Sequence, residues 1–135
     1  MQQFLITLLV IIAGAIGYLV VTFVFQPILR YRSIKSQILS DLVFYADVIN
    51  ADGMNDSMRR RLEQRVDDNR RNSANLRAIF SELPRPYKIW LRTRGVNIVC
   101  AATELMGLSN TFEYEAANTR ITRIKNFLKP DSNVV

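Results

Sequence analysis

Residues 4–25 read FLITLLVIIAGAIGYLVVTFVF, an apolar run of 22 residues without a charged side chain. As an α-helix, this run would be about 33 Å long, which is enough to cross the hydrocarbon core of a bilayer. Its polar side chains are Thr7, Tyr18 and Thr22. The sequence therefore predicts a transmembrane helix within residues 1–27, and Pro27 can kink or end it.

A cleaved signal peptide is the alternative interpretation, because Ala13-Gly14-Ala15 imitates a small-x-small cleavage site. Two features favour a retained helix. Residues 1–3 supply no Lys or Arg for the basic start of a signal peptide, and the apolar run continues for ten residues beyond Ala15. We therefore expect a single-pass membrane protein.

The charge distribution predicts the orientation of this helix. The chain has 18 Lys and Arg residues against 12 Asp and Glu residues, and residues 1–27 carry no charged side chain. Arg30, Arg32 and Lys35 follow the span directly, and basic residues mark the cytoplasmic end of a membrane helix. They also attract anionic membrane lipids. We expect an inner (cell) membrane protein with its N-terminus outside and residues 28–135 in the cytoplasm.

The composition argues against catalysis. The chain has no His, which removes the commonest general base and metal ligand, and Cys100 alone forms neither an internal disulfide nor a thiolate cluster. A lone Cys fits a reducing compartment. Asp67, Asp68 and Glu104 have no nucleophile or Gly-rich loop arranged around them. We expect no enzyme activity, no metal and no cofactor.

Helical periodicity dominates the rest of the chain, and no alternating strand pattern is present. Four helices are expected over residues 28–50, 56–83, 86–107 and 111–129. Turn signals separate them at Ala51-Asp52-Gly53, at Pro84-Arg85-Pro86 and at Ser109-Asn110, and Pro130 follows the last. The predicted fold class is all-α, with one membrane helix followed by a cytoplasmic four-helix bundle.

Local signals define some of the ends of these helices. Asp56 or Ser57 can cap the second helix, and Asn110 and Glu113 have capping-box spacing at the start of the last. The helix over residues 86–107 is apolar around its whole circumference, and such helices are normally buried on all sides. We therefore expect a second copy of the chain to cover part of it, in a homo-oligomer.

The membrane helix has one polar face. Thr7, Gly14, Tyr18 and Thr22 fall within about 100° of one another at 100° per residue. Several copies could place these residues against each other or around a narrow water path, as in an ion channel. The alternative is that they are ordinary residues tolerated in a span.

Arginine is concentrated on the second cytoplasmic helix, and it suits planar, multidentate contact with phosphate. On a helical wheel, one side of the apolar stripe is flanked by Arg59, Arg70 and Arg77. Asn69 and Ser73 lie on the stripe itself. This pattern predicts a binding site for an anionic nucleotide or oligonucleotide. The alternatives are that ion pairs use up the charge, and that the two polar residues set helix register.

Arg94 is an additional candidate for this binding site. On a helix over residues 86–107 it shares the face of Leu91 and Ile98, where an unpaired charge is costly. It would need an acidic partner or an anionic ligand, unless it reaches solvent near the helix start. Tyr87 and Trp90 could stack a base, although aromatic residues at helical spacing are more often part of a core.

The order of these parts resembles that of small transmembrane effectors of bacterial anti-phage defence, in which N-terminal membrane helices are joined to a compact cytoplasmic sensing domain. The resemblance concerns the layout and transfers no site residues. It implies a homo-oligomeric membrane effector, channel-forming or not, that senses a nucleotide or oligonucleotide signal. The alternative is a membrane-anchored adaptor or scaffold that docks a protein partner through its helical bundle.

Overall fold

The fold is all-α, as predicted from the sequence. The computed structural model describes residues 1–49, 53 and 55–129, and no strand occurs among them. The elements in chain order are α1 (Gln2–Val20), η1 (Val21–Phe25), α2 (Gln26–Phe44), α3 (Asp56–Glu82), α4 (Arg85–Thr93), α5 (Ile98–Ser109) and α6 (Tyr114–Leu128).

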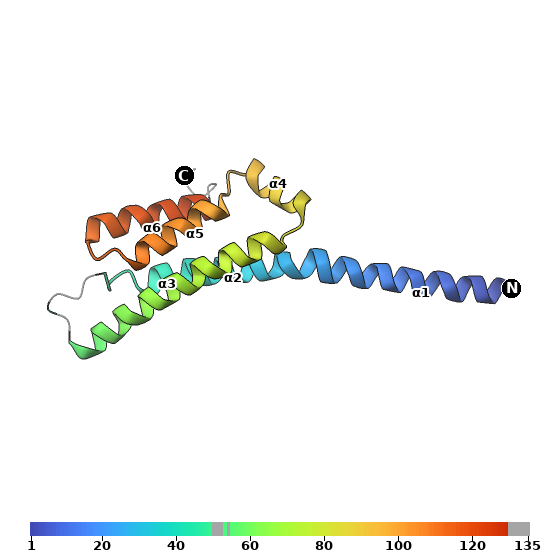
Figure 1. The fold of residues 1–135 in the computed structure, drawn as a ribbon, viewed down its shortest axis with the longest axis horizontal. Coiled ribbons are helices and arrows are strands. Elements are labelled where there is room, and N and C mark those ends of the chain that lie inside the picture. Colours follow the sequence, from blue (N-terminus) through green and yellow to red (C-terminus); the bar gives the residue numbers. More distant parts are fainter. Residues whose placement is uncertain (50–52, 54, 130–135) are drawn as a thin grey trace.

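The first three elements form one continuous rod of 43 residues, Gln2–Phe44, which is long and apolar enough to cross a membrane. Figure 1 shows α1 projecting from the other helices, and none of its side chains is buried. Pro27 does not end the helix. Because Pro27 has no N–H, the backbone just before it widens into the π-helical turn η1, where the Gln26 N–H donates to the Val21 oxygen.

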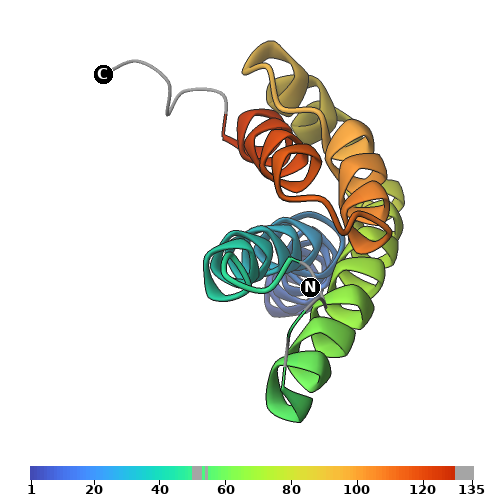
Figure 2. The ribbon, with the colours of Figure 1, turned by 90° about the vertical axis from the view of Figure 1, so that its left-hand side faces the viewer.

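The second half of this rod, α2, is part of a helical core. Figure 2 shows α2, α3, α5 and α6 arranged around a common centre. α3 packs on both α2 and α5, and α6 packs on α5 and more lightly on α2. The buried side chains include Ile38 and Leu42 of α2, Leu76 and Ile79 of α3, Ala102 and Leu105 of α5, and Ile124 and Leu128 of α6. α2, which continues directly from the candidate span, therefore also forms one side of the core.

The prediction of a single helix over residues 86–107 is wrong. α4 ends at Thr93, and Gly95 has a φ of +73°, a left-handed conformation that favours glycine and interrupts the helix. Asn97 then caps α5, because its side-chain oxygen accepts a hydrogen bond of 3.1 Å from the Cys100 N–H. Among the described residues, four helices surround the core, and α4 is a fifth, separate helix after the candidate span.

α5 is covered on one side only within a single chain. Ala101, Ala102 and Leu105 are buried, whereas Val99 is 47% and Met106 is 39% exposed. The expected burial on all sides is therefore not reached by one copy. Coverage by a second copy stays a prediction.

Several helix ends differ from the sequence-based boundaries. α2 ends at Phe44, although Tyr45, Val48 and Ile49 beyond it stay buried. Asn55, not Asp56 or Ser57, caps α3 by accepting a hydrogen bond of 3.0 Å from the Met58 N–H. α6 begins at Tyr114 without a side-chain cap. Residues 50–52 and Pro130 lie outside the described residues, so the predicted turn is described at Gly53 alone.

Candidate functional site

The predicted arginine site is only partly assembled. Arg59, Arg70 and Arg77 are all exposed on α3. Arg70 donates to the Asn110 side-chain oxygen at 3.2 Å, and Arg77 donates to the Thr103 hydroxyl at 3.4 Å. Arg59 precedes Arg70 by 11 residues, about 16 Å along the helix axis. Arg70 and Arg77 therefore border the junction of α3 with α5, and Arg59 lies apart from them.

The ion pairs among the described residues involve other arginines. Arg61 pairs with Asp47 at 3.1 Å, Arg30 pairs with Glu82 at 3.2 Å, and Glu104 accepts from both Arg120 and Arg123. Within the described residues of one chain, none of these pairs includes Arg70 or Arg77. Their guanidinium groups instead contact the uncharged side chains of Asn110 and Thr103.

Asn69 and Ser73 do not share this surface, because both are buried in the core. The Ser73 hydroxyl donates to the Ala102 carbonyl oxygen on α5 at 2.7 Å. The Asn69 side-chain nitrogen is buried and has no acceptor among the described residues. Their position fits the alternative that they set the register of α3 against its neighbours.

Arg65 has a role that the sequence did not indicate. Its side chain is 2% exposed, and its Nη2 donates to the carbonyl oxygens of Thr111 at 3.0 Å and Ile49 at 3.5 Å. Burial lowers the pKa of the Arg65 guanidinium. Arg65 ties α3 to the segment after α2 and to the segment before α6, so it serves the fold more than a ligand.

Polar contacts also join α2 and the chain just after it to α3. The Tyr45 hydroxyl donates to the Asp68 carboxylate at 2.7 Å, and the Asn72 side-chain nitrogen donates to the Asp41 carboxylate at 2.8 Å. Burial, followed by the hydrogen bond to Asp68, raises the pKa of Tyr45 to about 12. Asp41 and Asp68 therefore join α2 and the segment after it to α3. No cluster of potential metal ligands is found among the described residues.

Arg94 is exposed and does not lie on a buried helix face. The helix expected to carry it ends at Thr93, so Arg94 follows as the C-cap of α4. Its guanidinium lies 4.8 Å from the centre of the Trp90 ring, and Trp90 stacks on Tyr87 at 5.3 Å. Arg94 is therefore separate from the arginines of α3.

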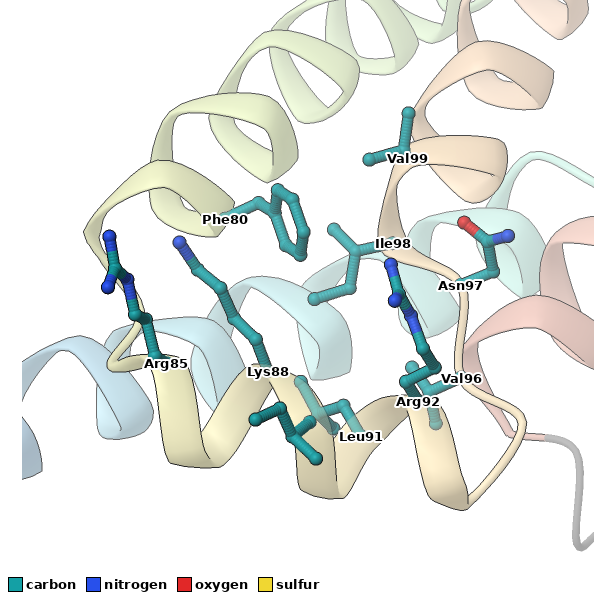
Figure 3. A pocket seen from close by; sticks show the side chains of 10 residues that line it. Phe80, Arg85, Lys88, Leu91, Arg92, Val96, Asn97, Ile98 and Val99 are labelled. Carbon is teal, nitrogen blue, oxygen red and sulfur yellow. The ribbon is translucent and has the colours of Figure 1, made fainter.

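A groove lined by both basic and apolar side chains is a feature that the sequence did not predict. It lies between the end of α3, α4 and the start of α5, and it has a volume of about 390 Å³. Figure 3 shows the charged ends of Arg85, Lys88 and Arg92 near the apolar side chains of Phe80 and Ile98. The break at Gly95 and Asn97 separates α4 from α5, and the groove lies where these two helices meet the end of α3.

The polar face of the candidate span packs against no separate helix among the described residues of one chain. Thr7, Gly14 and Tyr18 are exposed and Thr22 is half-buried. The Thr7 hydroxyl donates to the Gln3 carbonyl oxygen at 2.9 Å, and nothing lies within 4 Å of a Cβ placed on Gly14. This face has space for a second helix to approach closely.

No family model, curated protein or solved structure matches this chain. Three features of its own structure therefore bear on its function. They are a helical rod long enough to cross a membrane, the arginines at the junction of α3 with α5, and the groove lined by basic and apolar side chains.

Proposed function

We propose that this protein is a homo-oligomeric membrane effector whose cytoplasmic helices sense an anionic nucleotide or oligonucleotide and pass the signal to the membrane helix. One observation carries the proposal: the rod Gln2–Phe44 is both the candidate span and, through α2, a wall of the helical core. A shift of α2 against α3 would move the membrane segment as well. The proposed role in anti-phage defence rests on the layout of the chain alone.

The sensing surface is the junction of α3 with α5. Arg70 and Arg77 are seven residues apart, about 10 Å along the axis of α3, which suits a ligand with several phosphates. Arg pairs with phosphate through parallel N–H donors. Because Arg70 and Arg77 also donate hydrogen bonds to Asn110 and Thr103, a bound anion would compete for contacts between α3 and α5 with its C-cap.

The proposed membrane orientation rests on the basic residues after the candidate span. Arg30, Arg32 and Lys35 favour a cytoplasmic location for α2 and the helices that follow it, in the inner membrane. In an oligomer, the face with Thr7, Gly14, Tyr18 and Thr22 would line the contact between copies or a narrow pore. Ligand binding must favour one arrangement of these helices over another to act as a signal.

The sensing step is tested with the full-length protein in nanodiscs and a pool of fluorescein-labelled hexaribonucleotides. We expect an Arg70→Glu/Arg77→Glu variant to lose binding, while an Arg60→Glu/Arg71→Glu variant with the same change in charge retains most of it. An equal loss in both variants would mean unspecific charge attraction and would contradict the site. Anisotropy at several salt concentrations separates the two outcomes.

The membrane step needs its own measurement. Light scattering of the detergent-solubilised protein, corrected for detergent, should give a defined homo-oligomer. Ligand-dependent dye release from vesicles should then be lost in a Thr7→Leu/Thr22→Leu variant that still inserts. A monomer, or the absence of ligand-dependent release, would instead favour an adaptor that docks a protein partner. Release that persists after these substitutions would contradict the role of the face with Thr7 and Thr22.

A further inference from the structure

Two side-chain contacts place α4 near the start of α2 and therefore near the candidate span. The ion pair of Arg30 with Glu82 joins the start of α2 to the last turn of α3, directly before α4. The rings of Tyr31 and Tyr87 lie 6.3 Å apart and join α2 to α4. Figure 1 accordingly shows α4 at the end of the helical domain nearest α1.

This end of the domain lies beside the layer of lipid headgroups if residues 4–25 cross the bilayer, a premise taken from the proposed function. Tyr31 follows Phe25 by six residues, about 9 Å along the helix axis. The headgroup layer begins where the hydrocarbon core ends and is about 5–8 Å thick. α4 and the groove beside it therefore lie next to that layer.

The groove combines two kinds of surface. Arg85, Lys88 and Arg92 supply positive charge, and none of the ten described residues that line the groove is acidic. The Lys88 ammonium is held by the Ser81 carbonyl oxygen at 3.2 Å and lies 5.0 Å from the centre of the Phe80 ring. A free phosphate would satisfy the cations and leave the apolar wall uncovered. An amphiphile with an anionic head covers both.

The apolar side chains around the groove are unusually exposed for a helix that faces water. Ile89 is 65% and Val99 is 47% exposed, and both line the groove. Trp90, also on α4, is 43% exposed, and Trp is enriched where a protein meets the membrane interface. Exposed apolar residues beside cations are typical of helices that lie on an anionic lipid surface.

We propose that this groove binds an anionic phospholipid of the cytoplasmic leaflet. The headgroup phosphate lies among Arg85, Lys88 and Arg92, and the first part of an acyl chain covers Phe80, Ile89 and Val99. A lipid held in this way fixes α4 on the membrane surface and thereby orients α2 and α3, which contact it.

Trp90 is the chain's one tryptophan and reports lipid contact directly. Full-length protein is placed in nanodiscs of phosphatidylcholine with a minor fraction of phosphatidylglycerol, and bromine, which quenches Trp on contact, is carried by one lipid or the other at equal content. We expect stronger quenching by brominated phosphatidylglycerol. In an Arg85→Gln/Arg92→Gln variant the preference should fall about 25-fold, since each cation near an anionic surface contributes a factor of about five.

Arg60→Gln/Arg71→Gln is the matched control, since it removes the same charge from exposed positions of α3 outside the groove. The proposal is overturned if wild type shows no preference for phosphatidylglycerol, or if the groove variant keeps it. It is also overturned if soluble glycerol phosphate abolishes the preference, because the ligand would then be a free phosphate. Lys88→Gln, tested alone, repeats the comparison should the double variant lose helicity by circular dichroism.

Membrane insertion is measured separately, by resistance of the protein to extraction with alkaline carbonate. Extraction of the protein contradicts the proposed membrane function itself. Stable insertion without lipid preference contradicts only the groove.

Discussion

The Arg65 guanidinium donates a hydrogen bond of 3.0 Å to the Thr111 carbonyl oxygen, across 46 residues of sequence. Its Nη2 also reaches the Ile49 carbonyl oxygen at 3.5 Å. A single side chain of α3 thus fixes both the segment that follows α2 and the segment that precedes α6. Buried carbonyl oxygens need such partners, because leaving them without a donor is costly.

Replacing Arg65 should therefore destabilise the fold. We expect Arg65→Ala to lower the free energy of unfolding by about 2–4 kcal/mol, because a buried side chain and its charge-assisted hydrogen bonds are lost. Arg71→Ala, at an exposed position of the same helix, should change it by less than about 0.5 kcal/mol. Urea denaturation of the full-length protein in detergent, followed by circular dichroism, compares them. Equal midpoints for the two variants would refute the role of Arg65.

Alkaline pH should weaken the fold through its buried tyrosines. Burial raises the pKa of both Tyr31 and Tyr45 from 10.0 to about 12, so the folded state favours the neutral phenol. The unfolded chain loses these protons first, so stability is complete below pH 10 and falls between pH 10 and pH 12. The measurement is the urea midpoint as a function of pH.

Tyr45→Phe separates the contribution of this residue from that of Tyr31. It should cost about 1 kcal/mol at neutral pH, because the hydrogen bond to Asp68 is lost, and its stability should fall less steeply above pH 10. Tyr114→Phe removes an exposed tyrosine hydroxyl and serves as the control. A Tyr45→Phe profile parallel to that of wild type would rule out this explanation.

The turn at Gly95 separates the helices that line the groove, and substitutions of Gly95 should lower the free energy of unfolding. Its φ of +73° is left-handed, so Gly95→Ala should lower the free energy of unfolding by about 1–2 kcal/mol. Asn tolerates this conformation better than Ala, and Gly95→Asn should recover part of the loss. Thermal unfolding monitored by Trp90 fluorescence ranks the three proteins. A Gly95→Ala variant with an unchanged midpoint would show that the turn is not strained by a side chain.

The sequence predicts the helices correctly where a single physical signal dominates. The charge-free run over residues 4–25 predicts a membrane-length helix by composition, and the structure has one. Tyr31, Ile38 and Leu42 are seven and four residues apart, and this spacing predicts the face that α2 buries, because residues so spaced lie on one side of a helix.

The candidate site was less predictable, because it depends on where helices break and cross. A single glycine such as Gly95 is tolerated inside many helices, and the apolar residues continue after it. The sequence therefore predicts one helix where the structure has α4 and α5. Asn97, three residues before Cys100, was the available sign of a new helix start. On a helical wheel Arg65 lies at the edge of the apolar stripe of α3, and a wheel does not show that chain segments from elsewhere cover it.

Gly107 and Arg120 should be coupled in stability. The Arg120 side chain crosses over Gly107 of α5 to reach Glu104 at 2.8 Å, and a Cβ on Gly107 would clash with its guanidinium. In an Arg120→Ala background, Gly107→Ala should stabilise the protein by about 0.5–1 kcal/mol through higher helix propensity. In wild type the displaced ion pair should offset that gain. A double-mutant cycle of unfolding free energies measures the difference, and the same effect of Gly107→Ala in both backgrounds would exclude the coupling.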